Sequence, residues 1–428
     1  MTQSSFPAGE RSGSREPLSL NFSIVARVRG EFSLGQLQQA LDRVRVRHRL
    51  LIPGAEDESL VSAHFPLQVL TNGDSDHAWK EIVADELRTP FLNDSGPFAR
   101  FIWLQSNGYS DLIATFHHGI CDGFSGVYVM RDVLQALANP NTRVPALPLP
   151  PHIIRFIPEA VTKSLRVKWQ LRRNVMMIRL GALLLRLQKR FAAKPREDES
   201  ALTELPSNLR TCILTQTLTA SQTTRLVECC KVEGITVHAA LCTAWLSAFA
   251  GTLDEKASRV RIASSPVSLR NRLTQPAGEM AGMFMSTVET RLDCKPGRDF
   301  WEMAREFHAN LRQAATDEKV FMMPLMFGAL PADAIMEVGK AFFSRPVKYD
   351  FSITNLGRLD LPAKIGSLLI ESFYNLVNSS HHERTVNVNT FDGRLTFNLI
   401  FRESKMTSQE GEQLMAQAVR RLADASGW

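Results

Sequence analysis

The segment HHGICDG, residues 117–123, combines two histidines, an aspartate and a glycine at fixed spacing after an apolar run. Histidine is the simplest general base near pH 7, because its unperturbed pKa lies close to neutral. Asp122 can hold the turn before a helix by charge pairing, and Gly123 permits unusual backbone angles. Such a combination arises by chance in a chain of this size on the order of once in a thousand. The pattern therefore predicts a site of proton transfer.

These residues also allow other interpretations. Neighbouring residues of a strand point to opposite faces, so His117 and His118 cannot both bind one metal ion without a kink, and we expect no metal site. One histidine can instead pack while the other is exposed, with no chemistry. Cys121 lies beside His118, but a nucleophilic thiol needs a setting that lowers its pKa, and we favour no such role. A second pair, His381 and His382, lacks the aspartate and glycine and is predicted to be a loop.

The flanking elements predict how the motif is positioned. Residues 21–28 have the periodicity of a strand, and a helix follows that begins with a capping box formed by Ser33 and Gln36. Residues 112–118 are predicted to form another strand, and residues 124–138 have helical spacing. The motif therefore lies at a strand-to-helix junction.

The rest of the chain mixes helices and strands. A proline-rich loop over 139–152 precedes a long predicted helix over roughly 159–192. The second half is predicted to include a strand that ends at Arg270, a hairpin around Asp392-Gly393 and a last helix at about 408–425. The apolar residues expected on one face of the long helix are Val161, Leu165, Trp169, Met176, Leu180, Leu183, Leu187 and Phe191.

Length and composition limit the fold class. The chain has 428 residues, 44% of them hydrophobic and 22% charged, which is typical of globular proteins and too long for one ordinary core. We expect a mixed α/β or α+β protein of two lobes, residues 1–195 and 196–428, with the boundary in the polar segment KPREDES. No apolar stretch predicts a membrane-spanning helix, and no secretion signal is visible. The six scattered cysteines suit neither a zinc site nor a disulfide framework, so reduced thiols and a cytoplasmic location are expected.

Positive charge is concentrated between Arg155 and Arg196. This segment holds 12 basic residues and one acid, Glu159, a net charge of +11 against −5 for the rest of the chain. A basic face beside an apolar stripe can lie on a membrane surface. It can equally pack its stripe on the protein and offer its charge to an acidic partner. Nucleic acid is not expected, because the segment lacks interleaved stacking aromatics beyond Trp169.

Taken with the motif, further segments make the chain resemble the chloramphenicol acetyltransferase-like superfamily. HHxxxDG is the signature of that superfamily, which includes the condensation domains of nonribosomal peptide synthetases, polyketide-associated acyltransferases and alcohol acetyltransferases. The other similar segments, residues 20–51, 234–249, 265–288 and 350–359, fall in the expected order. The chain lacks the DFGWG motif of the plant members and so resembles the bacterial branches.

The resemblance implies a two-lobed fold with a tunnel between the lobes and assigns roles to the motif. His118 would be the general base that takes the proton of the acceptor. Asp122 would be structural and would pair with Arg270, or with Arg272 as the fallback.

The resemblance also implies supporting residues. Gly123 would leave room for a pantetheine arm, and His117 would support packing. Ser352, Thr354 and Asn355 lie on the strand similar to the family's inter-lobe strand. They are candidates for binding substrate, and ordinary sheet polarity is the alternative.

The resemblance implies a stand-alone acyltransferase. It would move an acyl group from a thioester of coenzyme A or of an acyl or peptidyl carrier protein to a small-molecule alcohol, forming an ester. The alternatives are an amine acceptor, as in a free-standing condensation enzyme that forms an amide, and a catalytically silent docking module for a carrier protein, against which the intact motif argues. No metal or redox cofactor is expected.

Overall fold

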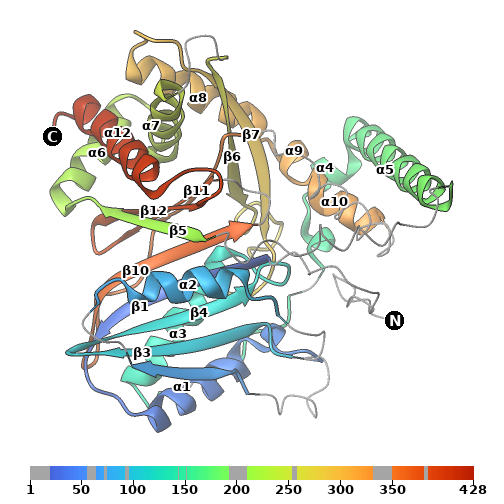
Figure 1. Cartoon of the computed structure of the whole chain (residues 1–428). Coiled ribbons are helices and arrows are strands. Elements are labelled where there is room, and N and C mark those ends of the chain that lie inside the picture. The colour runs from blue at the N-terminus through green and yellow to red at the C-terminus, as the bar shows by residue number, and fades with distance from the viewer. Residues whose placement is uncertain are drawn as a thin grey trace.

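The computed structural model describes most of the chain. The described residues are 20–54, 64–71, 75–91, 96–142, 144–150, 152–191, 210–252, 258–330, 349–379 and 384–428. The second histidine pair, at 381 and 382, lies outside these residues. The predicted mixture of helices and strands in two lobes is confirmed, since two six-stranded sheets stack with helices around them (Figure 1).

The first sheet has the strand order β2-β3-β4-β1-β10-β9. Adjacent residues of β1 serve opposite faces: Ile24 joins the core under α1 and α3, and Val25 joins the core under α2. The predicted capping box of Ser33 and Gln36 is present at the start of α1. The elements are β1 (Leu20–Arg29), α1 (Leu34–Arg47), β2 (Leu67–Thr71), α2 (Ala78–Arg88), β3 (Ala99–Ser106), β4 (Tyr109–His117), α3 (Gly123–Ala138), β9 (Lys364–Ile365) and β10 (Leu368–Ser379).

The second sheet has the order β5-β12-β11-β8-β6-β7. The predicted hairpin is present, with Asp392 and Gly393 at positive φ between β11 and β12. The elements are β5 (Thr211–Thr217), α6 (Ala220–Val232), α7 (Val237–Gly251), β6 (Val260–Ser268), β7 (Met285–Asp293), α8 (Phe300–Ala314), β8 (Phe351–Arg358), β11 (Arg384–Phe391), β12 (Arg394–Arg402) and α12 (Ser408–Ser426).

The uncharged helix α7 forms the centre of the second core, where Trp245 lies against Phe351 and Phe397 with ring centroids 5.9 and 6.3 Å apart. Among the described residues no single helix is both long and apolar enough to cross a membrane. The pair α6 and α7 passes that test by length and composition only, with a bend of 102° between the two helices.

The lobes are not two consecutive stretches of chain, and this corrects the predicted division at 195/196. Strand β10 leaves the second half and pairs with β1 along its whole length, as Leu20 opposite Ser379 and Arg29 opposite Leu369 show. The position of β10 in the first sheet is stable because both faces of the strand are buried, with Phe373 in one core and Leu376 in another. The predicted boundary at 195/196 lies outside the described residues.

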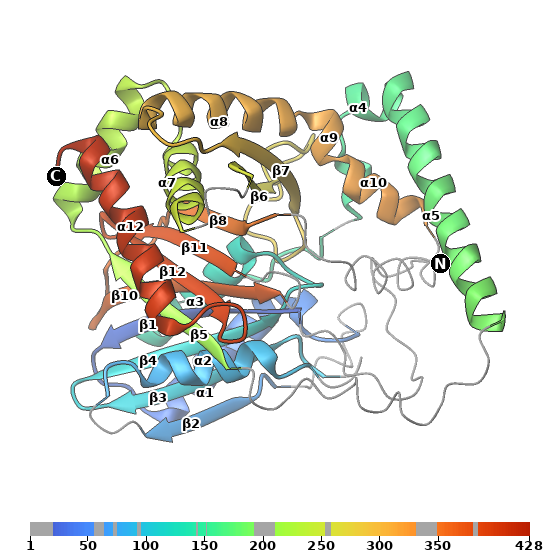
Figure 2. The ribbon, with the colours of Figure 1, turned by 45° about the horizontal axis from the view of Figure 1, so that its top comes forward.

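The long predicted helix is interrupted. It forms α4 (Glu159–Lys163) and α5 (Leu165–Phe191), and Ser164, with non-helical backbone angles, separates them. The Ser164 hydroxyl lies 3.0 Å from the carboxylate of Glu318, which belongs to the short α9 (Asp317–Val320). Helix α5 then extends beyond α10 (Met322–Ala329), away from both sheets (Figure 2).

Candidate active site

The motif lies at the junction of β4 and α3, as predicted. Asp122 is the N-cap of α3, and its Oδ1 accepts hydrogen bonds from the Ser125 amide at 2.9 Å and the Ser125 hydroxyl at 2.8 Å. Helix α3 lies close to β1, because a Cβ at Gly126 would come within 2.5 Å of the Phe22 ring. The residues between His117 and Asp122 are thus held between a buried strand and a capped helix.

The ring of His118 is oriented by the motif's own backbone. Its Nδ1 lies 3.1 Å from the carbonyl oxygen of Cys121, and a carbonyl only accepts, so Nδ1 carries the proton. The ring packs on Phe22 at a centroid distance of 4.9 Å. Desolvation lowers the pKa of His118, although the Cys121 carbonyl and the Asp122 carboxylate act in the opposite direction. The ring is therefore neutral near pH 7, and its unprotonated Nε2 has a lone pair that can accept a proton.

His117 has a different environment. Its Nδ1 accepts a hydrogen bond from the amide of Gly119 at 3.1 Å. Its ring meets Phe91 and Phe98 edge-on, with centroids 5.8 and 6.1 Å away. These contacts suit the packing role that the resemblance implies for this histidine.

The predicted ion pair between Asp122 and Arg270 is present and buried. Arg270 Nη2 lies 2.8 Å from Asp122 Oδ1, and the two residues are 4% and 2% exposed. Arg270 Nη1 also donates to the carbonyl oxygens of Gly278 and Met280 at 2.9 and 3.0 Å. Oδ2 of Asp122 accepts from the amide of Phe284 at 3.2 Å. The pair thus ties the motif to the loop between β6 and β7.

Arg272, the fallback partner, is placed elsewhere. Its Nη1 donates to the carbonyl oxygen of Ala315 at 2.7 Å and to Asp317 at 2.8 Å. Arg272 therefore secures the end of α8, and the choice of Arg270 is the correct one.

Ser125 is a site residue that the sequence analysis missed. Its hydroxyl, which donates to Asp122 Oδ1, also lies 3.1 Å from the carbonyl oxygen of Gly282. It accepts from Arg270 at 2.9 Å and from the Gly282 amide at 3.1 Å. The available signal was its position three residues after Asp122, where an N-cap carboxylate meets the backbone. Ser125 completes the network that joins α3 to the second lobe.

Strand β8 approaches the motif from the second lobe. A Cβ at Gly123 would lie 3.2 Å from Cδ2 of Leu356, so glycine here allows close packing of β8 on the start of α3. Ser352 is buried within the sheet, and Thr354 and Asn355 are half-buried. Oδ1 of Asn355 accepts a hydrogen bond from the Gly357 amide at 2.8 Å. Substrate contacts of Ser352, Thr354 and Asn355, and the role of Gly123 in leaving room for a pantetheine arm, stay predictions.

The environment of Cys121 argues against a nucleophilic role. The side chain is fully buried, and burial together with the Asp122 charge raises the pKa of the thiol well above its usual value. All six cysteines are free thiols. Within the described part of the chain, no group of three His, Cys, Asp or Glu side chains is placed to hold a metal ion.

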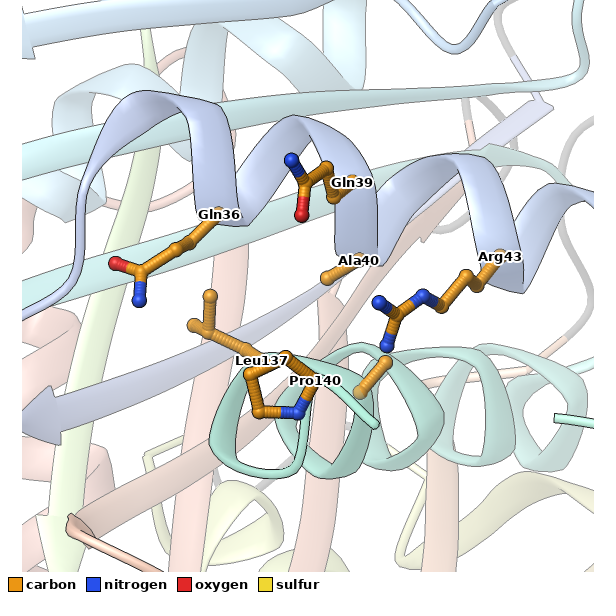
Figure 3. Close-up of a pocket in the computed structure, with 7 residues that line it drawn as sticks. Gln36, Gln39, Ala40, Arg43, Leu137 and Pro140 are labelled. Carbon is orange, nitrogen blue, oxygen red and sulfur yellow. The ribbon is translucent and has the colours of Figure 1, made fainter. Parts of the chain in front are cut away.

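Two cavities lie away from the motif. The first, of about 10 Å³, lies between α1 and α3 and is large enough for about one water (Figure 3). The second, of about 360 Å³, lies between α7, β6 and α8. Its lining includes His238, whose Nε2 is 2.9 Å from the Ser265 hydroxyl. Burial lowers the pKa of His238 to about 4. Neither cavity is lined by a motif residue, and the tunnel stays a prediction.

Comparison with known proteins gives matches of two kinds. Residues 213–400 match the family described as phthiocerol/phthiodiolone dimycocerosyl transferase C-terminus. A curated relative, phosphinothricin tripeptide synthetase PhsC of Streptomyces viridochromogenes, is 27% identical over 243 residues. That match covers 54% of this chain and 20% of the relative, so the chain spans only part of that protein's length.

Solved structures share the fold over nearly the whole chain. The trichothecene 15-O-acetyltransferase of Fusarium sporotrichioides superposes with a TM-score of 0.70 at 12% identity, covering 95% of this chain and 92% of its own. Polyketide synthase associated protein 5 of Mycobacterium tuberculosis has a TM-score of 0.61 at 14% identity, with 96% and 95% covered. The first condensation domain of the CDA synthetase has a TM-score of 0.64 at 14% identity, with 95% and 91% covered.

Proposed function

We propose that the chain is a member of the chloramphenicol acetyltransferase-like superfamily of acyltransferases and condensation domains, as its matches support, and that it transfers an acyl group from a thioester to a hydroxyl acceptor. The observation that carries this proposal is the environment of His118. Its Nδ1 is held by the Cys121 carbonyl, and desolvation lowers its pKa. A neutral ring with an available Nε2 is the form that a general base requires.

The proposed reaction needs only this base. Nε2 of His118 takes the proton of the acceptor hydroxyl as the oxygen attacks the thioester carbonyl carbon. A new carbon–oxygen bond forms, and the tetrahedral intermediate then loses its carbon–sulfur bond. The departing thiolate takes the proton from Nε2, so the products are an ester and a free thiol and His118 is neutral again.

Asp122 acts in this scheme as a positioning residue. Its side chain is engaged by Arg270 and Ser125, so it is committed to the lobe contact rather than to the proton. The Asp122 amide donates to the carbonyl oxygen of Gly282 at 3.1 Å. Since Cys121 directly precedes Asp122, this contact also positions the carbonyl that orients His118.

The comparisons support both acceptor classes to different degrees. A hydroxyl acceptor is supported by the trichothecene 15-O-acetyltransferase, whose name specifies transfer to oxygen. An amine acceptor is the second candidate and is supported by the 27% identity with a tripeptide synthetase. The donor thioester is carried by coenzyme A or by a carrier protein, and the likeness to condensation domains supports the latter.

Intact-product mass spectrometry tests the proposal. The protein is incubated with a panel of acyl thioesters, on coenzyme A and on a carrier protein, and with mixed alcohol and amine acceptors. We expect an ester whose formation stops with His118→Ala and continues with His64→Ala, an exposed histidine. Amide products alone would select the second candidate. Binding of a carrier protein without any transfer would identify a docking module and overturn the proposal.

A further inference from the structure

Helix α5 exposes a large apolar surface. Among the described residues, half of the fourteen strongly exposed large apolar side chains belong to this one helix. Their exposed fractions range from 48% to 83%. They are Leu165, Trp169, Met176, Met177, Leu180, Leu183 and Leu184. Over this length a helix is about 30 Å long, so the exposed face is a continuous feature of the surface.

This face is not the one that holds α5 to the protein. Val167 is 2% exposed and belongs to the core cluster under α4, α9 and α10, and Leu171 packs against that cluster. The Asn174 amide lies 3.7 Å from the sulfur of Met326 on α10. The helix therefore has an attached side, and the exposed apolar residues occupy a different side.

Basic residues border the exposed face. At about 3.6 residues per turn, Lys168, Arg172 and Arg179 fall along one edge. In the first half of the helix, Arg166 and Arg173 fall along the other edge. All five are exposed, and α5 contains no acidic residue. The Arg173 guanidinium lies 5.1 Å from the centre of the Trp169 ring, so charge and apolar surface are in contact.

We propose that α5 docks the protein on an anionic lipid bilayer, with its exposed face in the interface and its basic edges among the headgroups. A bilayer offers negative charge above an apolar layer, which matches a basic border around an apolar face. A second copy of the chain fits poorly, because the same cationic edges would face each other. A folded acidic protein would complement the positive charge, but it would also need an apolar groove that fits a convex helix. The position of α5 at the edge of the molecule lets a flat surface reach it (Figure 2).

The primary test is flotation of the full chain with vesicles, which requires no turnover and is therefore independent of the proposed function. Phosphatidylcholine vesicles are compared with vesicles in which about one-third of the lipid is phosphatidylglycerol, at low and high salt. We expect binding to the anionic vesicles, weakened by salt. Trp169 is the one tryptophan of six that is strongly exposed, so its fluorescence should shift to the blue on binding. The shift should be absent in Trp169→Phe.

Two triple variants separate the contributions. The charge variant should bind about a hundred-fold more weakly, since each cation near an anionic surface contributes about fivefold. The apolar variant should lose at least about tenfold. The charge variant is Arg172→Gln with Arg173→Gln and Arg179→Gln. The apolar variant is Met176→Gln with Leu180→Gln and Leu183→Gln.

Matched control variants carry the same kinds of substitution on other exposed elements and should bind like the parent. They are Lys231→Gln with Lys295→Gln and Arg420→Gln, and Leu34→Gln with Val232→Gln and Val260→Gln. Melting curves verify that all variants are folded. The proposal is overturned if the parent protein does not bind anionic vesicles, or if the α5 variants bind these vesicles as strongly as the control variants do. It is also overturned if the α5 substitutions abolish self-association or carrier-protein binding while vesicle binding is absent.

Discussion

Replacing Asp122 with alanine would leave the guanidinium of Arg270 buried without its carboxylate. Arg270 is 4% exposed and would keep the hydrogen bonds to two backbone carbonyls and the Ser125 hydroxyl, together with its contacts to the rings of Tyr128 and Phe284, but no anionic partner among the described residues. Breaking a buried pair by removing one member costs about 3–5 kcal/mol. The carboxylate also accepts from two backbone amides, those of Ser125 and Phe284, and its loss removes the N-cap of α3. We therefore expect Asp122→Ala to fall at the upper end of this range.

Comparison variants separate charge from capping. Asp122→Asn keeps a good N-cap and one oxygen acceptor but removes the charge, so it should cost less than Asp122→Ala. In the double variant Asp122→Ala with Arg270→Met, neither charge remains. The double variant should therefore be more stable than the sum of the single losses predicts, with a coupling of about 0.5–3 kcal/mol.

Thermal melts and urea titrations measure these differences. For a chain of this size 1 kcal/mol shifts Tm by roughly 1–2 °C, so Asp122→Ala should melt about 5–10 °C below the parent. A loss of under about 1 kcal/mol, or strictly additive effects in the double variant, would refute the assignment of Asp122 and Arg270 as a coupled buried pair. An Arg272→Gln variant is the matched control, because that arginine bonds to Ala315 and Asp317 instead.

Further predictions concern the proton chemistry of the motif. His118→Ala should stay folded and lose about 10²–10⁴-fold in kcat, whereas His117→Ala should lose less; equal losses in steady-state assays would contradict separate roles. Because desolvation lowers the pKa of His118, its ring stays neutral to a lower pH, so the acidic limb of the kcat/KM profile should lie below pH 6.5; a limb at or above that value would contradict it. Cys121→Ala should retain transfer, and the buried thiol should resist alkylation in the folded protein; loss of transfer in a folded variant would implicate the thiol.

Local signals predicted much of the fold. The capping box at Ser33 and the turn at Asp392-Gly393 each depend on a few neighbouring residues, and both are present. The pairing of β10 with β1 could not be predicted, because the two strands are more than 300 residues apart in sequence and periodicity carries no information on pairing. The interruption at Ser164 was also missed, because it depends on a contact with Glu318 that the helical pattern does not contain.

Predicting the candidate site required information beyond local sequence patterns. The motif itself could be found from residue types and spacing, but the pairing of Asp122 with Arg270 joins positions 148 residues apart. That pairing came from the resemblance, and no local pattern indicates it. The apolar stripe of the helix predicted over 159–192, which the structure divides into α4 and α5, follows from its spacing, yet spacing alone does not distinguish a face that packs from one that is exposed. Burial separates the two, with Val161 inside and Leu165 outside.

The contacts around the motif imply that stability and the proposed catalysis are coupled at this site. His118 is oriented by the carbonyl of Cys121, and the next residue, Asp122, is held by groups from the second lobe. The Gly282 carbonyl accepts from the Asp122 amide, and Leu356 packs against Gly123. A change that loosens this lobe contact should therefore disturb the orientation of His118, the proposed base, without touching it. Such a change should lower kcat in proportion to the loss of stability, whereas a change at His118 should lower kcat alone.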